Sequence, residues 1–251
     1  MYEKYYGKIE AKKPFDGKME PFRISENIYF VGTYQSSCHL IDTGEGLILI
    51  DTGYFSALYL VLDSIRKLGF DICDIKYILH SHWHGDHTEA TEALVNLTGA
   101  KTLIGEYDVP YLKELGYFTP DIIMEDGYVL SLGNVSIECM HTPGHTKGTM
   151  SFFMKTEYMG KEYLAGMFGG AGANSLVPEH PSYYEGCRAD YLASIEKLLK
   201  KKVSVFLGNH CWNNQTDEKA AILAEGKENP FIAPDEWTEF LLFCKQRCEN
   251  L

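Results

Sequence analysis

Apolar residues recur along the chain in two spacings that predict alternating strands and helices. Short apolar runs predict strands over residues 27–32, 46–51, 75–79 and 102–105. Apolar positions three or four residues apart predict a helix over residues 55–68, and a second helix is expected over residues 88–97. This order favours an α/β fold in which helices cover a sheet.

The second half of the chain repeats this order. A hairpin is predicted around Gly133-Asn134, from strands over residues 128–132 and 135–140, with further strands over 150–154, 163–165 and 203–207. Helices are expected over residues 190–200, 217–225 and 235–248. Two strand-rich halves, each followed by helices, predict two sheets with helices outside them, an α/β layered sandwich. No Pro/Gly/Ser linker divides the chain, so we expect a single domain over residues 1–251, with its motifs in 25–215 and C-terminal helices in 217–250.

Charge and composition narrow the classes of partner. The 251 residues carry a formal net charge of −12, which weighs against nucleic acid because its affinity rests on Lys and Arg at phosphates, although a local basic groove stays compatible with it. No apolar run approaches the roughly 18 residues that a membrane span needs. We therefore expect a small-molecule substrate, no nucleic acid and no membrane, with the oligomeric state left open.

The cysteines and the first residues indicate a compartment. Seven Cys are scattered without a Cys-x-x-Cys pair, which is typical of reduced thiols in a cytosol. Residues 1–8 contain no apolar segment of the kind that a secretory signal has. We expect a cytoplasmic protein, although a precursor that had already lost its signal would read the same way.

The richest candidate chemistry lies in residues 80–87, His-Ser-His-Trp-His-Gly-Asp-His, between a predicted strand and a predicted helix. Neutral imidazole and carboxylate are ligands that Zn²⁺ prefers. His145 and His210 also follow predicted strands, and loops at strand ends are where layered α/β folds place their chemistry. We expect six ligands to converge there, enough for two open sites of three: His82, His84, Asp86, His87, His145 and His210. Two Zn²⁺ ions are the expected cofactors, with iron or manganese as alternatives.

Three motifs resemble those of the metallo-β-lactamase superfamily. They are the His-x-His-x-Asp-His run within residues 80–87, Thr-Pro-Gly-His-Thr over residues 142–146, and the strand with an Asp-Thr-Gly turn over residues 46–53. The resemblance implies an αβ/βα sandwich with a dinuclear site. By position, it implies a first metal on His82, His84 and His145 and a second on Asp86, His87 and His210. It also implies that Asp86 holds the attacking water and that Asp51 supports the ligands from beneath, although a purely structural turn at Asp51 is an equal alternative.

One position departs from many hydrolytic members of that superfamily. Met167 stands where those members carry an Asp that bridges both metals. A ligand set without a bridging acid resembles the third subclass of metallo-β-lactamases, so we place the chain near that branch. A thioether is a poor ligand for Zn²⁺, and we expect Met167 to be a packing residue in the wall of the site.

These observations predict a zinc-dependent hydrolase that uses a metal-bound hydroxide on an acyl substrate, either a β-lactam-like cyclic amide or a lactone, ester or thioester. A phosphodiesterase or nuclease of the same fold is an alternative, against which the acidic charge and the missing bridging Asp count. A di-iron redox protein is another, but such proteins resemble His-x-Glu-x-Asp, whereas His84 stands at the Glu position here. Asn174 and Trp212 are candidate substrate contacts, Asn174 as an oxyanion donor, with ordinary surface loop positions as the alternative.

Overall fold

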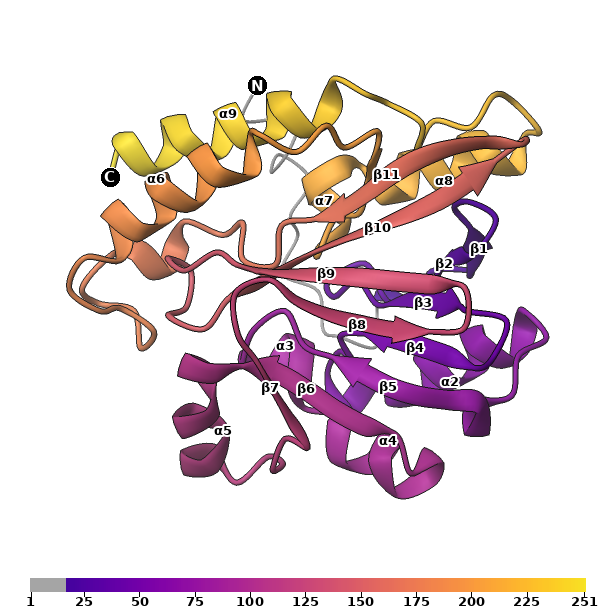
Figure 1. Cartoon of the computed structure of the whole chain (residues 1–251), viewed down its shortest axis with the longest axis horizontal. Coiled ribbons are helices and arrows are strands. Elements are labelled where there is room, and N and C mark those ends of the chain that lie inside the picture. The colour runs from indigo at the N-terminus through magenta and orange to yellow at the C-terminus, as the bar shows by residue number, and fades with distance from the viewer. Residues whose placement is uncertain (1–16) are drawn as a thin grey trace.

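The computed structural model of the chain describes residues 17–251, and residues 1–8, on which the expectation of no secretory signal rests, lie outside that range. Two β-sheets face each other and helices cover their outer surfaces (Figure 1). The first sheet has seven strands in sequence order: β1 (Phe22–Arg23), β2 (Ile28–Phe30), β3 (His39–Asp42), β4 (Leu47–Ile50), β5 (Ile75–Leu79), β6 (Lys101–Gly105) and β7 (Ile122–Met124). Strands β4 to β7 are parallel, so their carboxyl ends share one edge.

The second sheet has five strands in the order β12-β11-β10-β9-β8. They are β8 (Tyr128–Leu132), β9 (Val135–His141), β10 (Met150–Tyr158), β11 (Lys161–Met167) and β12 (Val205–Phe206). The β8–β9 turn needs Gly133, whose φ is +52° and whose added Cβ would lie 2.1 Å from the Thr43 carbonyl oxygen. This turn therefore lies directly against the first sheet's β3–β4 connection.

Helices surround both sheets. In chain order they are α2 (Leu58–Lys67), α3 (Gly85–Thr88), α4 (Thr91–Thr98), α5 (Val109–Leu115), α6 (Cys187–Leu198), α7 (Cys211–Asn214), α8 (Thr216–Ala224) and α9 (Glu236–Glu249). Helices α2 and α4 pack on the outer face of the first sheet through a buried cluster that includes Val61, Ile65 and Leu94. Helices α6 and α9 pack together on the outer face of the second sheet, with Tyr191, Ile195 and Trp237 buried.

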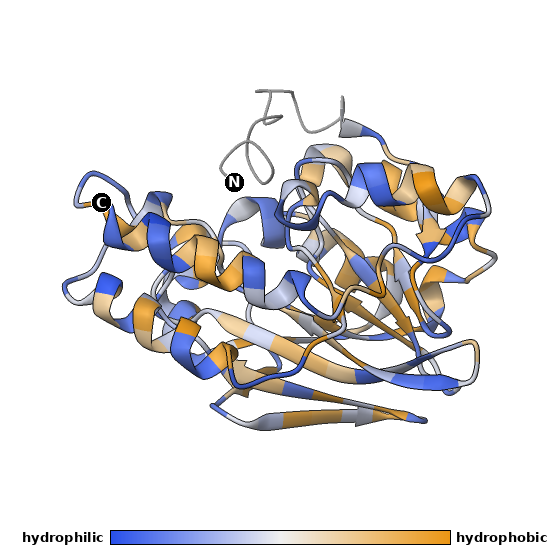
Figure 2. Ribbon diagram, turned by 90° about the horizontal axis from the view of Figure 1, so that it is seen from above, coloured by the Kyte–Doolittle hydropathy of each residue, from blue (hydrophilic) through white to orange (hydrophobic). Residues whose placement is uncertain are grey.

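The largest buried cluster lies between the two sheets. It joins Ile48, Ile50 and Leu79 of the first sheet to Phe152 and Met167 of the second. Figure 2 shows mainly apolar colouring on the strands in the middle of the molecule and alternating polar and apolar colouring along the helices beside them. Four layers, helix, sheet, sheet and helix, confirm the predicted αβ/βα sandwich.

The short elements differ most from the sequence prediction. The helix expected over residues 88–97 is two helices, α3 and α4, which are separated at Glu89 and Ala90. Strands β1, β3 and β7 and helix α7 were not predicted, because two to four residues carry too little periodicity to recognise. Helix α5 lies in the segment after residues 102–105, where the sequence indicates a mixture of helix and loop. These elements are stabilised by their neighbours in the fold rather than by a local pattern.

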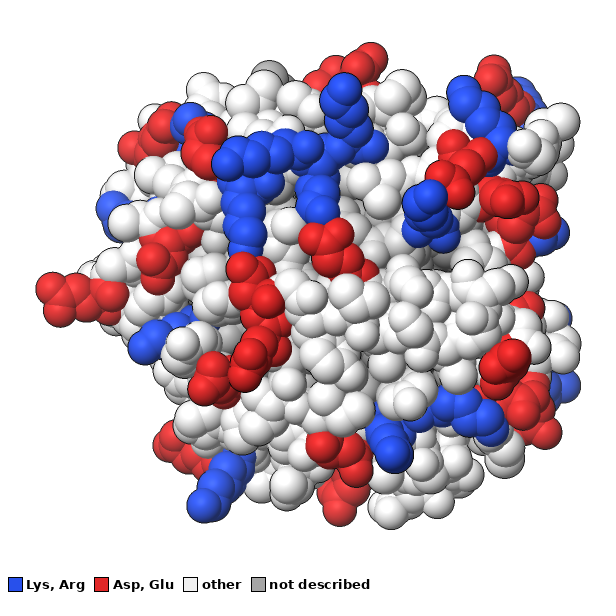
Figure 3. Space-filling view, viewed as in Figure 1, with Lys and Arg blue, Asp and Glu red and all other residues white. Residues whose placement is uncertain are grey.

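No helix within residues 17–251 is long and apolar enough to cross a membrane. On the face in Figure 3, basic and acidic side chains are interspersed. Ion pairs at the surface include Lys197 with Asp126 at 2.7 Å and Lys201 with Glu138 at 2.6 Å. Exposed pairs of this kind contribute little stability, at most about 1 kcal/mol each.

Candidate metal centre

Loops from both sheets meet at one edge of the sandwich. Residues 80–87 follow β5, and Asp51 follows the neighbouring parallel strand β4. His145 lies in the turn between β9 and β10, and His210 follows β12. The rings of His82 and His145 are 4.7 Å apart between centroids, and those of His87 and His210 are 5.1 Å apart. The predicted convergence of three histidine-bearing loops is therefore observed in the structure.

The first group of candidate ligands is His82, His84 and His145, whose ligand atoms all lie within 4.8 Å of one another. His145 Nε2 lies 3.1 Å from His84 Nδ1. His82 Nε2 is buried and has no hydrogen-bond partner among the described residues. Inward-facing ring nitrogens that lack a protein partner are the donor set that a zinc ion uses.

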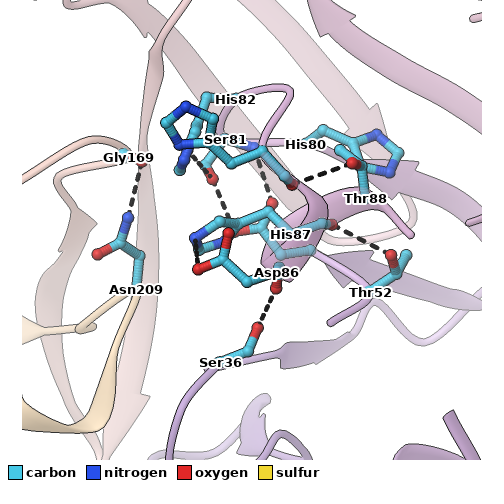
Figure 4. Close-up of polar contacts among 12 residues, drawn as sticks. Ser36, Thr52, His80, Ser81, His82, Asp86, His87, Thr88, Gly169 and Asn209 are labelled. Carbon is cyan, nitrogen blue, oxygen red and sulfur yellow. Dashed lines mark hydrogen bonds and ion pairs between the residues drawn. The ribbon is translucent and has the colours of Figure 1, made fainter. Parts of the chain in front are cut away.

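The second group surrounds Asp86, in the first turn of α3. Ligand atoms of His82, Asp86 and His87 also lie within 4.8 Å of one another. Asp86 Oδ2 is 3.4 Å from His87 Nε2 and 3.8 Å from His210 Nε2. His87 Nε2 makes no hydrogen bond to any residue in the described part of the chain. All six residues predicted from the sequence are thus gathered in one cluster, part of which is drawn in Figure 4.

Each histidine of the cluster is held through its other ring nitrogen. Such outer partners fix the ring orientation and the tautomer of a metal ligand. The partners are Ser81 Oγ for His82 at 3.0 Å, Ser182 Oγ for His84 at 2.5 Å, Asp51 Oδ2 for His87 at 2.8 Å, the Gly172 carbonyl for His145 at 2.7 Å and the Gln35 carbonyl for His210 at 2.6 Å. The five rings are therefore positioned before any ligand binds.

Asp51 is the buried carboxylate beneath the cluster. Its φ of +58° is a left-handed conformation that Asp tolerates better than most residues. In this conformation its carboxylate accepts hydrogen bonds from Ser81 N at 2.8 Å, Ser81 Oγ at 2.7 Å and His87 Nδ1 at 2.8 Å. Asp51 therefore has a structural role in the turn, and its side chain also orients His87 and the start of the histidine run.

Burial and neighbouring charges shift the pKa values of the histidines in the cluster. Burial lowers the pKa of His84 to about 2 and that of His145 to about 4, and it holds the pKa of His82 well below its usual range. Burial alone would also lower the pKa of His87, but the carboxylates of Asp86 and Asp51 raise it to about 10. The first group therefore offers neutral lone pairs, as burial also favours at His210, whereas at His87 the two carboxylates favour a positive charge.

The other predicted residues lie in three different places. Met167 is fully buried between the sheets, as expected of a packing residue. Trp212 stacks on His210, with ring centroids 4.5 Å apart and an interplanar angle of 6°. Asn174 is exposed, and its side-chain nitrogen lies 3.5 Å from His180 Nε2. Trp212 is thus beside the cluster, while Asn174 contacts it through His180, whose ring centroid is 5.8 Å from that of His84.

The sequence reasoning missed Ser182 and Asp108. Ser182 is buried in the segment before α6 and reaches His84 across 98 positions of sequence, so no local signal marks it. Asp108 is fully buried and accepts hydrogen bonds from both histidine-bearing loops. Its position soon after strand β6 is the only signal that could have identified it.

Comparisons with known proteins agree with this site and fold. Residues 31–210 match the model of the metallo-beta-lactamase superfamily. The fold is similar to the FEZ-1 metallo-beta-lactamase of Legionella gormanii, with a TM-score of 0.87 and 30% identity over 93% of this chain and 95% of that one. It is also similar to BJP-1, a subclass B3 metallo-beta-lactamase of Bradyrhizobium japonicum, with a TM-score of 0.88 and 30% identity over 96% of both chains.

Another relative is named for a different substrate class. An N-acyl homoserine lactonase of a Bacillus species is 28% identical over 207 residues, which cover 68% of this chain and 80% of the relative. The expected resemblance to the third subclass agrees with the presence of a B3 enzyme among the structural neighbours. The family model matches most of the length of this chain, and the fold and the histidine cluster agree with it. The chain therefore belongs to the metallo-β-lactamase superfamily of metal-dependent hydrolases.

Proposed function

We propose that the chain is a zinc-dependent acyl hydrolase with a dinuclear site. His82, His84 and His145 hold the first ion, and Asp86, His87 and His210 hold the second. The observation that carries this proposal concerns the two nitrogens of each histidine ring. One nitrogen is hydrogen-bonded to the protein, and the other faces the cluster. Structural zinc sites are closed by four ligands, whereas three protein ligands leave a position for water or substrate.

The donor set fits the cofactor. Among the described residues, the buried Nε2 atoms of His82 and His87 have no hydrogen-bond partner, and an unpaired buried polar atom costs about 1–3 kcal/mol. A cation at each site would remove that cost and would also balance the carboxylates of Asp51 and Asp86. When bound, two ions supply Lewis acidity and make water a stronger nucleophile near neutral pH.

The residues of the chain have separate tasks in the reaction. Asp86 presents one carboxylate oxygen to His87 and His210, and its other oxygen would accept a hydrogen bond from the attacking water. Asp51 keeps His87 in the tautomer that is protonated at Nδ1. Ser36 donates a hydrogen bond to the backbone carbonyl of Asp86 and holds this residue against the first sheet (Figure 4).

We propose a cyclic amide or a lactone as the substrate class, with thioesters and open esters as further acyl candidates. Support comes from relatives named as β-lactamases and as an N-acyl homoserine lactonase. Two aromatic rings flank the cluster, because Trp83 packs edge-on against His84 at 4.6 Å and Trp212 stacks on His210. These rings give an apolar part of a substrate a surface on either side of the reacting bond, and Asn174 with His180 supplies polar atoms beside it.

The first experiment measures metal content and activity on one preparation. Elemental mass spectrometry of protein purified without added metal should find two zinc ions per chain. The same protein, loaded with zinc, is then tested against a β-lactam, an N-acyl homoserine lactone and a thioester. Iron in place of zinc would favour the redox alternative, and hydrolysis of bis(p-nitrophenyl) phosphate alone would favour the phosphodiesterase.

Two substitutions test the assignment of the ions to the ligands. His84→Ala should lower kcat at least about 10³-fold and remove mainly one ion, because three ligands become two. His210→Ala should remove mainly the other ion. His141→Ala is the control and should keep both ions, since its ring lies at the base of the loop that carries His145, where Nε2 contacts the Lys147 carbonyl at 2.8 Å and the ring stacks on Tyr107. Equal loss of both ions in each variant would contradict the assignment.

A further inference from the structure

A second buried aspartate lies on the opposite side of the histidine run from Asp51. Asp108 ends a short 3-10 turn (Glu106–Asp108) after β6 and precedes α5. It is fully buried, and no ion pair involves it within residues 17–251. A buried carboxylate without a cation is costly, so its hydrogen-bond partners must explain its presence.

Those partners come from two separate loops. Asp108 Oδ2 accepts hydrogen bonds from the backbone N–H of Trp83 at 3.0 Å and from Thr146 Oγ1 at 2.8 Å. Its Oδ1 accepts a third from the Gly148 N–H at 2.8 Å. One carboxylate therefore joins the loop of residues 80–87 to the loop of residues 142–149.

These contacts lie next to all three residues that hold the first ion in the proposed site. Trp83 stands between His82 and His84, and Thr146 directly follows His145. The residues of the second ion are held elsewhere, His87 by Asp51 and His210 by the Gln35 carbonyl. Asp108 is thus placed to act on one ion and not on the other.

Close packing shows that the approach of the second loop to Asp108 is tight. An added Cβ at Gly148 would lie 2.5 Å from Asp108 N and 2.6 Å from its Cγ. Only glycine lets the backbone at this position come so close. The loop can therefore sit against the carboxylate in one arrangement, which fixes the distance between the two histidine-bearing loops.

We propose that Asp108 is a positioning residue that sets the spacing of His82, His84 and His145 for the first metal ion. This inference rests on the dinuclear site proposed above. Within residues 17–251, Asp108 makes no hydrogen bond to a ligand side chain, and it acts through the backbone of Trp83 and Gly148 and the side chain of Thr146. Its loss should weaken one ion selectively and distort that ion's coordination, while the second ion stays bound.

Asp108→Asn tests this directly, because the amide keeps the shape but turns one acceptor into a donor that faces an N–H or O–H group. Titrations with zinc and with cobalt(II) should show one of two ions bound about 10-fold more weakly, or weaker still. The cobalt(II) absorption spectrum should change for that ion alone. With both sites saturated, kcat should fall and KM should stay near the wild-type value.

Asp121→Asn is the matched control. The Asp121 carboxylate accepts hydrogen bonds from Thr102 N at 2.8 Å and Thr102 Oγ1 at 2.9 Å, near the opposite end of β6 from Asp108. The Asp121→Asn variant should be less stable than wild type, and neither the binding of either ion nor the cobalt spectrum should change. If Asp108→Asn also keeps wild-type affinities and spectrum, the positioning role is refuted.

Two further results would need separate treatment: an Asp108→Asn variant that does not fold, and a wild-type protein that binds fewer than two ions. If Asp108→Asn does not fold, Thr146→Val removes one donor while keeping the carboxylate, and a smaller change in the same direction is expected. An unchanged spectrum in that variant would also refute the role of Asp108. If wild-type protein binds fewer than two ions, the dinuclear proposal itself fails, whatever the variants show.

Discussion

Histidine side chains serve two purposes in this protein, and their surroundings separate them. His80, within the histidine run, is a structural residue, because its two ring nitrogens contact the Leu103 carbonyl at 3.0 Å and Thr91 Oγ1 at 2.8 Å. The five histidines of the cluster keep one nitrogen directed inward. His39 on β3 belongs to neither type, since it is buried and its Nδ1 has no hydrogen-bond partner within residues 17–251.

His39 should make the protein sensitive to acid. Burial lowers its pKa to about 4 from an ordinary value of 6.5, so the unfolded chain binds a proton that the folded chain refuses. Stability should therefore fall as the pH drops below about 6.5, and this residue alone should contribute a loss of about 2 kcal/mol between pH 7 and pH 5. Urea unfolding of wild type and His39→Leu at both pH values measures the difference.

The variant is expected to lose less stability than wild type over that interval, whatever its stability at pH 7. His141→Leu provides the control, because the His141 ring is half-buried at the surface, where it contacts the Lys147 carbonyl and stacks on Tyr107. Equal slopes in wild type and His39→Leu would show that His39 is not held neutral in the folded protein.

At the scale of elements, helix α6 supports the loop that carries His145. Ser194 of α6 donates a hydrogen bond to the Pro143 carbonyl at 2.8 Å. Gly144 has a φ of +140°, and an added Cβ would lie 2.5 Å from the Cβ of Tyr191 on the same helix. The glycine of the Thr-Pro-Gly-His-Thr motif is therefore required both by its backbone conformation and by its contact with α6.

Gly144→Ala should displace this loop from α6. The strained φ and the contact with Tyr191 together should cost more than about 2 kcal/mol and reduce zinc binding through His145. Gly186→Ala is the control at the start of the same helix, where φ is +91° but an added Cβ meets nothing within 4 Å. Thermal unfolding and zinc titration of both variants measure the difference. Equal losses of stability and of zinc affinity in the two variants would mean that contact with α6 is unimportant.

The same scale shows where sequence reasoning succeeds and where it stops. The strands that deliver the histidines were predictable, because β5 and β9 are apolar runs that end at a motif. The outer partners were not, since Ser182 and Gln35 reach the histidines over 98 and 175 positions of sequence. Only the packing of α6 and of the first sheet brings them close, and no local pattern encodes that packing.

At the scale of the whole molecule, the cluster joins the two sheets. His82, His84 and Asp86 follow β5 of the first sheet, whereas His145 and His210 lie on loops of the second. In the proposed dinuclear site, the first ion would therefore link β5 to the β9–β10 turn, and the second would link β5 to the loop after β12. Metal bound to both sheets would stabilise the folded state, because the unfolded chain cannot keep these ligands together.

Removing the metal should therefore lower stability as well as activity. An ion present at about 100 times its Kd contributes about 2.7 kcal/mol, so two ions contribute about 5 kcal/mol. For a chain of this size that corresponds to a fall in Tm of about 10–20 °C. Thermal unfolding with EDTA, compared with EDTA already saturated with zinc, measures the effect, and added zinc should restore both Tm and hydrolysis. An unchanged Tm alongside lost activity would mean that the ions are bound without joining the sheets, so that the edge of the sandwich is held by the protein alone.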